Sequence, residues 1–515
     1  MAIEEAEPTT WADLRLDILI FATYQLCHAL STQQVIPVLL NYTPKVGCFD
    51  NVCQEIEEKC YRKCDTCTNV CANSTDFETC KSQYKPDFLS SAMEYEYYCI
   101  GFYKAFSAIT LQYLGVAVGN FFVGNFADKF GRRVTLMGAI LLGIPELVLT
   151  GVIVSLPAFY VLRFMVGLSI AGSMSVAWTY CSEMISTRNR LKLRTYTSYS
   201  MGRVIMVLLA HLAGEWRRAL FYHAALCSLT IVVLFFLPES IIWLKRKGDP
   251  DKILKGKRRV AEIKGESFHS SEESLPSEKE ETQKTQKPKV SLMDVLRHHE
   301  LRINFFVLST VFMFSSLTEY LIDLNGEDMA KNLWIGQYMS GLLASLTRFL
   351  VGIADAYWEW LGRRIVLLSA LAATTLYLIV YVMTYNAIAV TWEPTYVCCT
   401  ELMPTDVRGS VTAYLGLISR IGSLIASSMI VLKTVHEPIL TITVAVGNAI
   451  TFVVAAYYLK ECKNCDLEAI GTGDTVMSES KSKSGSDSKS KSGPATNKVA
   501  PEGGDSRSPS DTPTK

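Results

Sequence analysis

The sequence predicts an all-α membrane protein made of two related halves. Apolar runs near twenty residues long recur along the 515-residue chain, and a helix needs about 20 apolar residues to cross the hydrocarbon core of a bilayer. The runs lack the alternation of a membrane barrel, so helices are left to satisfy the backbone in lipid. A polar turn also occurs twice with the same pattern, which is typical of transporters built from structural repeats.

The repeated turn lies between two apolar runs in each half. Its first copy is Gly124–Arg133 (GNFADKFGRR), and Glu359–Arg364 (EWLGRR) matches the end of that copy position for position. A single copy would indicate only a basic loop on the cytoplasmic side. Two copies favour a latch, in which a carboxylate caps a neighbouring helix or pairs with an arginine. The expected gating residues of the two turns are Asp128, Gly131, Arg132, Arg133, Glu359, Gly362, Arg363 and Arg364.

Twelve spans are expected, with boundaries good to several residues. The first six are Ile18–Leu40, Ala105–Phe126, Val134–Val154, Leu156–Cys181, Thr195–Leu212 and Leu220–Leu237. The second six are Phe305–Leu324, Leu333–Ala354, Ile365–Met383, Ala387–Thr400, Val411–Val431 and Ile439–Leu459.

The tenth of these spans is expected to be short or damaged. Only 36 residues separate Arg364 from Glu401, too few at about 1.5 Å each for two comfortable spans and a turn. Ala387–Thr400 also contains Pro394. A single crossing here would move everything after it to the other side. Twelve spans are preferred because Glu401–Arg408 would otherwise face the wrong way.

Lysine and arginine set the expected orientation. With twelve spans, the basic loops fall on one side together with both termini, which should therefore be cytoplasmic in a multi-pass protein of the plasma membrane. The acidic start lacks a cleavable signal, so the first span is expected to be a retained anchor. The expected parts are an N-terminal half (1–244) with an external loop (41–99), a partly disordered cytoplasmic linker (245–300), a C-terminal half (301–465) and a disordered tail (466–515).

The external loop is rich in cysteine. An even number of cysteines in an oxidising compartment argues for disulfides, although their pairing stays open. Zinc is the alternative for the CxxC at Cys64 and Cys67, but the loop has no histidine. Asn73 begins a glycosylation sequon. The eight loop cysteines are Cys48, Cys53, Cys60, Cys64, Cys67, Cys71, Cys80 and Cys99.

Several functional classes find no support in the sequence. The formal net charge is zero and no basic domain is visible, which argues against nucleic-acid binding. No nucleotide-binding loop is visible either, which argues against direct use of ATP. We see no catalytic constellation, and we expect no enzyme, no cofactor and no metal.

The chain resembles the organic cation, organic anion and carnitine carriers, solute carrier family 22, of the major facilitator superfamily. Beyond the first turn and the cysteine-rich loop, the resemblance rests on motifs spread over roughly residues 11–460. They are Tyr42–Pro44 with Cys48, Arg163–Gly167, Ser182–Glu183, Pro238–Ser240 with Trp243–Leu244, and Glu401–Thr405 with Arg408. The resemblance implies two six-helix bundles around a central cavity that opens to each side in turn. It also implies small organic ions as substrates, possible coupling to another ion, and a lipid bilayer around the protein.

The chain departs from the family pattern at two places. Trp360 stands where the second turn should have a basic residue, and Ala344 stands near the place of an acid in the eighth helix. The latch in the second half is therefore expected to be weaker.

Charge inside a membrane is costly and marks candidate functional sites. Arg420 lies in a span, where the resemblance matches the anion and carnitine carriers. A guanidinium in a dry cavity can hold a carboxylate by two hydrogen bonds, which favours an anionic or zwitterionic substrate. The alternative is that Arg420 pairs with a helix acid such as Glu393. Four carboxylates in or near the spans are candidate proton carriers: Glu146, Glu319, Asp323 and Glu393. Glu319 and Asp323 share one helical face, and the alternative is that they lie in water at the helix end, which is preferred for Asp323.

Aromatic side chains and further charges complete the expected site. Organic substrates stack on aromatic rings, and the expected substrate-binding set is Arg420, Glu319, Phe314, Trp334 and Tyr338, with Phe312, Tyr320 and Trp392 as further candidates. Lipid-facing positions are the alternative for each ring. Glu183 with Arg188 and Glu401 with Arg408 are expected to form ion pairs that break and re-form as the cavity switches. Static surface pairs are the alternative.

The preferred function is a secondary transporter of small organic anions or zwitterions by alternating access. An organic cation transporter is one alternative. Another is a transporter-like membrane receptor or scaffold that no longer transports, which the shortened region before Glu401 motivates. A channel is disfavoured because nothing resembles a selectivity filter.

Overall fold

The computed structural model describes residues 11–42, 46–49, 52–55, 88–95, 108–186, 189–266, 292–325, 333–358, 362–375, 381–404, 407–433 and 438–459. The chain forms two units, Met1–Gly471 and Thr472–Lys515, and every described residue belongs to the first. Several expected residues lie outside the described ones: Arg188, Glu359, Asn73, Cys60, Cys64, Cys67, Cys71, Cys80 and Cys99.

Six long helical segments make up the N-terminal half, and three of them are interrupted helices. The first runs from α1 through the short turn η1 into α2, the fourth from α8 through a π-helical turn η3 into α9, and the fifth from α10 into α11. The bounds are α1 (Trp11–Ser31), η1 (Thr32–Gln34), α2 (Ile36–Leu40), α6 (Ala108–Phe130), α7 (Arg132–Val152), α8 (Leu156–Ala171), η3 (Gly172–Val176), α9 (Ala177–Met184), α10 (Arg190–Tyr196), α11 (Tyr199–Ala213) and α12 (Trp216–Phe236).

Six further helices make up the C-terminal half: α17 (His299–Asn325), α18 (Leu333–Tyr357), α19 (Arg363–Thr375), α20 (Tyr381–Glu401), α21 (Arg408–Lys433) and α22 (Pro438–Tyr458). Shorter helices lie outside the two bundles: α4 (Ser91–Tyr95), α13 (Ile241–Lys247), α14 (Pro250–Lys264) and α16 (Leu292–Arg297).

Local sequence explains where several of these helices begin and end. Ser198 caps α11 by accepting the backbone N–H of Met201, and Asp249 caps α14 in the same way from Lys252. Both residues are preferred caps because their oxygens satisfy an unpaired N–H of the first turn. Gly248 ends α13 in the left-handed conformation, as is common at a helix C-terminus.

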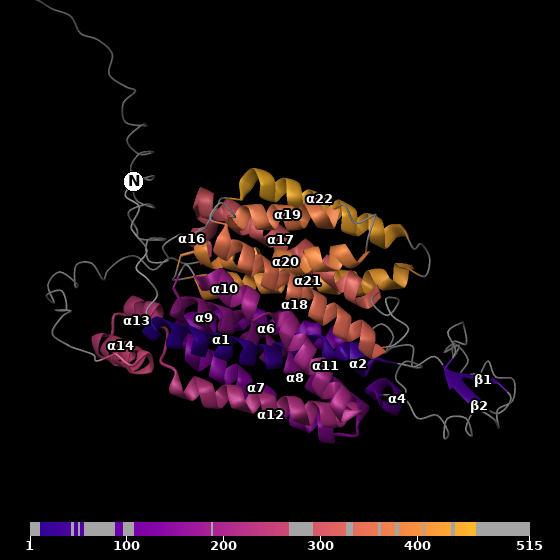
Figure 1. The fold of residues 1–515 in the computed structure, drawn as a ribbon. Coiled ribbons are helices and arrows are strands. Elements are labelled where there is room, and N and C mark those ends of the chain that lie inside the picture. Colours follow the sequence, from indigo (N-terminus) through magenta and orange to yellow (C-terminus); the bar gives the residue numbers. More distant parts are fainter. Residues whose placement is uncertain are drawn as a thin grey trace, which may run out of the picture. The chain divides into compact units, whose positions relative to one another are not determined.

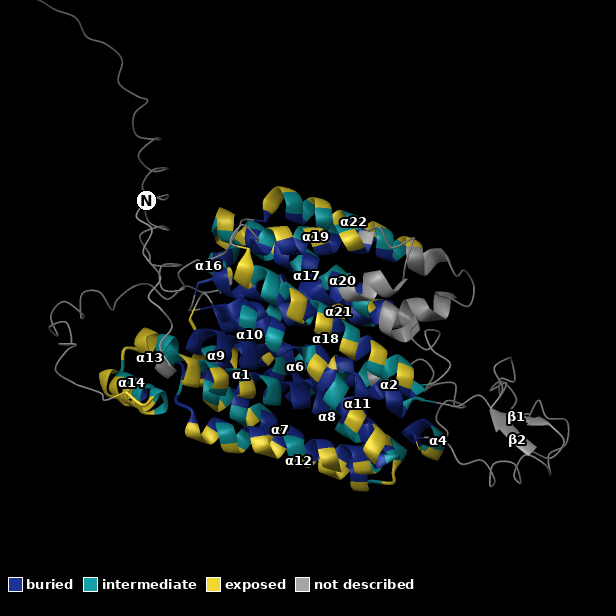
Figure 2. Ribbon diagram, in the orientation of Figure 1, coloured by how far each residue is buried: buried dark blue, intermediate teal, exposed yellow. Residues whose placement is uncertain are grey.

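The two sets of helices form two bundles that lie side by side (Figure 1). The indigo-to-magenta bundle contacts the orange-to-yellow bundle through the pairs α6 with α21, α11 with α18, and α10 with α20. We call the end that carries Gly131 and Gly362 the GRR end, and the opposite end, where α2 stops and α4 lies, the loop end. Buried residues concentrate between the bundles, while exposed residues face outward (Figure 2).

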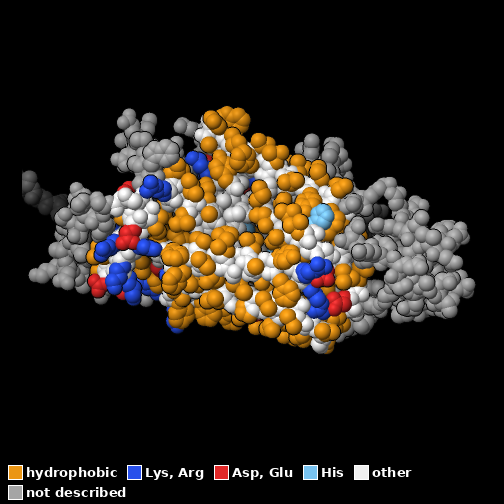
Figure 3. All heavy atoms as spheres, turned by 60° about the horizontal axis from the view of Figure 1, so that its bottom comes forward, with side chains coloured by type: hydrophobic (Ala, Val, Ile, Leu, Met, Phe, Trp, Pro, Cys, Tyr) orange, Lys and Arg blue, Asp and Glu red, His pale blue; other side chains and the backbone are white. Residues whose placement is uncertain are grey.

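The outer surface is apolar over its middle and charged near its two ends (Figure 3). Exposed apolar side chains such as Phe121, Leu141 and Val232 form this band on α6, α7 and α12. Six described helices are long and apolar enough to cross a membrane: Arg132–Val152, Leu156–Met184, Trp216–Phe236, His299–Leu321, Leu333–Tyr357 and Arg408–Ala426. This surface is the one expected for a protein solvated by lipid.

One sequence expectation about the helices needs correction. The tenth span is not short, because α20 has 21 residues with Pro394 inside it. Tyr385 and Asn386 made this helix seem to begin late, because hydropathy does not count polar residues as part of a span. Outside the helical bundles, β1 (Val46–Phe49) and β2 (Val52–Glu55) pair as an antiparallel hairpin whose register sets Cys48 opposite Cys53.

A substitution at Gly167 should show how closely α6 and α8 pack. A Cβ atom at this position would lie 2.2 Å from the carbonyl oxygen of Gln112, so the helices would have to move apart. We expect Gly167→Ala to lower the free energy of unfolding by about 1–3 kcal/mol. The measurement is thermal unfolding of the purified protein in detergent.

The matched control is Gly138→Ala, because a Cβ on this glycine of α7 meets nothing within 4 Å. That variant should be neutral or slightly stabilising, since alanine favours a helix over glycine. Equal destabilisation by the two substitutions would contradict the packing argument.

Candidate functional site

A cluster of buried charges closes the GRR end. Within the N-terminal half, Arg132 on α7 donates to the carboxylate of Asp128 at 2.6 Å and lies 3.5 Å from that of Glu183. The neighbouring Arg133 donates to the carbonyl oxygens of Leu234 and Phe235 at the end of α12. The two arginines of the turn therefore do different work, one inside the cluster and one at a helix C-terminus, where a cation is favoured.

The turn itself requires a glycine. Gly131 has a φ of 120°, and a Cβ there would lie 2.6 Å from a carboxylate oxygen of Glu239. The same carboxylate accepts the backbone N–H of Arg133 at 2.8 Å. Burial raises the pKa of Glu239 above its usual value, although the N–H groups of Arg133 and Ser240 favour its charged form.

The cluster joins the two halves of the molecule. Asp128 on α6 accepts the backbone N–H of Ser410 on α21 at 2.9 Å. Glu183 on α9 lies 3.5 Å from Arg408 on α21, and both side chains are 0% exposed. These contacts therefore link the two bundles at the GRR end.

The ion pairs differ from the expected ones. The expected partner of Arg408 is Glu401, but Arg408 is paired with Glu183, and Arg190 lies 3.7 Å from Glu401. The acids and bases are thus exchanged between the halves, which sequence spacing does not reveal. Both observed pairs are buried and do not lie on the surface. Arg188, the expected partner of Glu183, lies outside the described residues.

In the described part of the second turn, the acid that contacts an arginine is Asp355. Arg363 donates to Asp355 of α18 at 2.9 Å, while Glu359 lies outside the described residues. The sequence comparison of the two turns does not identify Asp355, because Asp355 lies eight positions before Arg363, whereas Asp128 lies four positions before Arg132. Arg364 donates to the carbonyl oxygen of Ala456 on α22, as Arg133 does to the end of α12.

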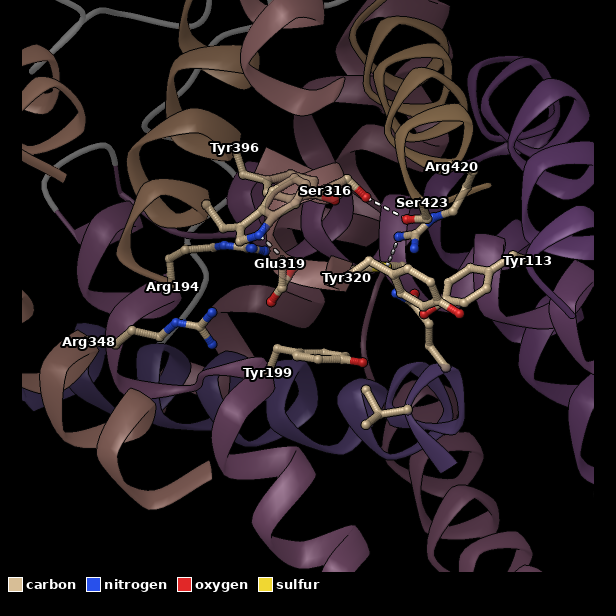
Figure 4. A pocket seen from close by; sticks show the side chains of 14 residues that line it. Tyr113, Arg194, Tyr199, Ser316, Glu319, Tyr320, Arg348, Tyr396, Arg420 and Ser423 are labelled. Carbon is tan, nitrogen blue, oxygen red and sulfur yellow. Dashed lines mark hydrogen bonds between the residues drawn. The ribbon is translucent and has the colours of Figure 1, made fainter. Parts of the chain in front are cut away.

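A cavity lies between the bundles and is lined by residues from both halves (Figure 4). Its lining combines three guanidinium groups, one carboxylate and many rings. The charged lining residues are Arg194, Arg348, Arg420 and Glu319, and the aromatic ones are Tyr113, Tyr199, Tyr320, Trp392 and Tyr396. Such a mixture of apolar rings with a few convergent charges is typical of a site for a small organic molecule.

Among the described residues, no carboxylate pairs with the cavity arginine Arg420. Its guanidinium lies 5.6 Å from the ring centre of Tyr113, and its Nη2 contacts the sulfur of Met174 at 3.5 Å. Its Nε has no hydrogen-bond partner although it is buried. The side chain is 4% exposed, so this charge is costly unless a ligand supplies the missing anion.

Glu393 instead holds the two other arginines. It lies 2.8 Å from Arg194 on α10 and 2.9 Å from Arg348 on α18. The alternative in which Arg420 pairs with Glu393 is therefore wrong. The described charged residues of this region are three arginines and two glutamates, Glu319 and Glu393. Their sum leaves one positive charge in excess.

Glu319 lies between Arg194 and Arg420 in the view of Figure 4. It accepts a hydrogen bond from the indole N–H of Trp392 at 2.8 Å. The side chain of Asp323, its expected neighbour, lies outside the described part of the helix.

The chain matches known transporters. The sequence profile of the Major Facilitator Superfamily matches residues 89–427. The chain belongs to this superfamily. It is 23% identical over 402 residues to the organic cation transporter-like protein of Drosophila melanogaster, covering 71% of this chain and 70% of the relative. It is 26% identical over 370 residues to organic anion transporter 3 of Rattus norvegicus, covering 68% of each. The resemblance to organic ion carriers is thereby confirmed.

A solved structure also shares the fold. The proton:xylose symporter XylE, bound to 6-bromo-6-deoxy-D-glucose, aligns with a TM-score of 0.58 over 88% of this chain and 98% of its own. At 13% identity, the similarity bears on the fold alone. The predicted fold of two helical bundles is confirmed. The family to which this membrane transporter belongs acts on small-molecule substrates.

Two of the five expected substrate-binding residues line the cavity of this major facilitator protein. These are Arg420 and Glu319. Trp334 and Tyr338 lie at the loop end, where Trp334 stacks on His211 with ring centres 4.4 Å apart and the Tyr338 hydroxyl lies 3.2 Å from the same imidazole. Phe314 packs inside the C-terminal bundle, where a Cβ on Gly447 would lie 2.5 Å from its ring.

Several lining residues carry a signal that the sequence does offer. Arg194 and Arg348 are arginines within or beside predicted spans, and the cost of burying them marks them as candidates. Trp392 and Tyr320 were among the candidate rings. Nothing in the sequence distinguishes Tyr113, Tyr199 or Tyr396 from tyrosines that face lipid.

Removing Glu183 should test the charged cluster. Glu183→Gln leaves Arg132 and Arg408 buried without this carboxylate, and we expect it to lower the free energy of unfolding by about 3–5 kcal/mol. Glu183→Gln combined with Arg408→Gln should cost less than the sum of the two single changes, because the partners are lost together. The measurement is thermal unfolding of all three variants.

An exposed ion pair provides the control. Arg259, 44% exposed and 2.8 Å from Glu262, should tolerate substitution by glutamine within about 0.5 kcal/mol. Additive losses for Glu183 and Arg408 would show that the pair does not couple the two halves.

Proposed function

We propose that this protein is a secondary transporter that carries small organic anions or zwitterions across the plasma membrane by alternating access. The observation that carries the proposal is Arg420, a buried guanidinium in the central cavity with no carboxylate partner among the described residues. A substrate carboxylate would supply that partner through two parallel hydrogen bonds. The one positive charge in excess around the cavity supports an anionic group rather than a simple cation.

The buried cluster at the GRR end supports the gating part of the proposal. Its contacts tie Asp128 to Ser410 and Glu183 to Arg408 across the two halves. In the proposed cycle these ties form when the GRR end is closed and break when it opens. The basic residues of α13 and α14 lie at the same end, so we assign this end and both termini to the cytoplasm.

Glu319 supports a zwitterion over a simple anion. It places a carboxylate in the same cavity as Arg420, with the rings of Trp392 and Tyr320 nearby in the lining. An ammonium group binds well between a carboxylate and aromatic faces. A molecule with a carboxylate and a cationic nitrogen could therefore bind Arg420 through the carboxylate and Glu319 through the nitrogen.

Uptake by cells that display the protein tests the proposal. The panel contains labelled aromatic carboxylates, trimethylammonium carboxylates and quaternary ammonium cations. We expect saturable uptake of a carboxylate-bearing compound, and at least a tenfold lower kcat/KM in Arg420→Gln because loss of a charge-assisted hydrogen bond costs about 1.5–3 kcal/mol. Arg302→Gln, on an exposed arginine of α17, is the matched control and should keep normal uptake.

Two results would contradict this proposal. Uptake of cations alone would overturn the role of Arg420 while leaving the transporter. No uptake of any compound by protein confirmed at the cell surface would favour a receptor or scaffold.

The preference for zwitterions is tested separately at Glu319. Glu319→Gln removes the negative charge and keeps the shape, so uptake of trimethylammonium carboxylates should fall about tenfold or more. Uptake of aromatic carboxylates should persist. A parallel loss of both activities would assign Glu319 to the structure of the cavity and not to recognition of a cation.

A further inference from the structure

Glu393 and its two arginines form an ion cluster at the depth of the cavity. Arg194 and Arg348 both line the cavity, and Glu393 binds each of them through one carboxylate oxygen, at 2.8 Å and 2.9 Å. The side chains of the three residues are between 2% and 8% exposed. This cluster is separate from the charged cluster at the GRR end, which consists of other residues on α6, α7, α9 and α21.

The two ion pairs of Glu393 differ in what they connect. Glu393 on α20 and Arg348 on α18 belong to the same half, and Arg348 also donates to the carbonyl oxygen of Ala389 on α20 at 3.0 Å. Arg194 belongs to the other half, where its Nη1 donates to the hydroxyl of Tyr24 on α1. The Arg194–Glu393 pair thus crosses the interface between the halves.

Further contacts concentrate at the same place. The guanidinium of Arg194 lies 4.1 Å from the ring centre of Tyr396 on α20. The indole N–H of Trp178 on α9 donates to the backbone carbonyl oxygen of Tyr396 at 3.1 Å. Arg194 therefore sits where α9 and α10 of one half meet α20 of the other.

Separation of the halves would affect the two ions unequally. Glu393 would keep Arg348, because both move with the C-terminal half. Arg194 would keep the hydroxyl of Tyr24 but lose its described carboxylate. The buried Arg194–Glu393 pair would have to break as the halves part, and loss of one partner of a buried ion pair is strongly disfavoured, so the empty protein resists opening at this point.

We propose that Arg194 is a second anion site of the cavity, occupied by Glu393 when the carrier is empty and, during transport, by an anion other than the one that pairs with Arg420. The incoming anion neutralises Arg194 from the cavity side, and Glu393 stays paired with Arg348. Each half then keeps its own charges balanced, so the halves can separate. Anion binding shifts the equilibrium because it favours the open state over the closed one.

This proposal rests on the proposed function and adds a regulatory step to it. The carrier opens toward the GRR end with an anion on Arg194 and stays closed without one. A carrier with this property returns across the membrane more easily loaded than empty, so it favours exchange of anions over net flux.

The experiment measures a distance between the two halves, not transport. Spectroscopic labels are installed through non-canonical residues at Lys255 on α14 and Tyr357 on α18, which are exposed at the GRR end of each half. Pulsed electron paramagnetic resonance then reports the populations of short and long distances in the full-length protein in lipid nanodiscs. The probe anion is benzoate, added to the wild type and to Glu393→Gln.

We expect Glu393→Gln to increase the long-distance population about fivefold or more without any anion, as a typical coupling between two sites predicts. Benzoate should lengthen the distance in the wild type and have little further effect in the variant. The control is Glu94→Gln, which removes the carboxylate 2.6 Å from Arg217 within one half and should leave the distance unchanged.

Each alternative outcome overturns a defined part of the proposal. A wild-type distance distribution in Glu393→Gln means that the pair with Arg194 does not lock the halves. A lock that opens in the variant, but that benzoate does not affect in the wild type, means that an anion does not replace Glu393. Absence of uptake across the whole panel would overturn the proposed function instead, and it leaves the distance measurement without benzoate fully interpretable.

A second variant guards against loss of folding in Glu393→Gln. Glu393→Asp keeps the charge but shortens the side chain by one methylene, so one carboxylate can no longer span both arginines in the observed geometry. It should open to an intermediate extent. A wild-type distance distribution in Glu393→Asp would show that the Glu393–Arg194 pair does not hold the halves together, as the same result in Glu393→Gln would.

Discussion

The need of a buried guanidinium for a counter-charge organises the interface between the two halves. Transfer of an arginine side chain out of water is costly, and the cost is met only by an anion at hydrogen-bonding distance. At the GRR end, Glu183 lies close to both Arg132 and Arg408. At the level of the cavity, Glu393 forms ion pairs with Arg194 and Arg348. In both places one carboxylate serves two arginines, one from each half.

The same constraint makes Arg420 stand out. The lining of the cavity contains two arginines with a described carboxylate and one without. A buried charge without a counter-ion destabilises a protein. A binding site for an anion explains why Arg420 is kept, because the bound anion would be its counter-ion. The contrast within a single cavity carries more weight than the mere presence of an intramembrane arginine, because the neighbouring arginines show what a structural role looks like here.

The sequence revealed the architecture because the signals for it are local. Apolar runs, the polar turn after α6 and the caps of individual helices depend on neighbours along the chain, so helices such as α7 and α12 fall close to their expected ranges. Partners across the interface depend on how two bundles face each other. That arrangement explains why Arg408 pairs with Glu183 rather than Glu401, and why Trp334 stacks on His211 instead of lining the cavity.

The cavity was only partly accessible from the sequence for a related reason. An apolar helix that packs on protein on one side and on lipid on the other is apolar all round, so its pattern does not show which rings face inward. Arginine gives a stronger signal, because lipid excludes it from the outer surface. Arg420 was recognised in this way, whereas Tyr113 and Tyr396 became visible only once the helices were in place.

The expense of the interface also bears on whether the two halves move. Replacing a buried ion pair by well-packed apolar side chains is often neutral or stabilising, so a permanent contact between α9, α10, α20 and α21 would gain nothing from Glu183, Glu393 and their arginines. Ion pairs have one property that apolar contacts lack: a charged ligand can compete for either partner. An interface that must open in response to a small anion needs that property, and a static scaffold does not.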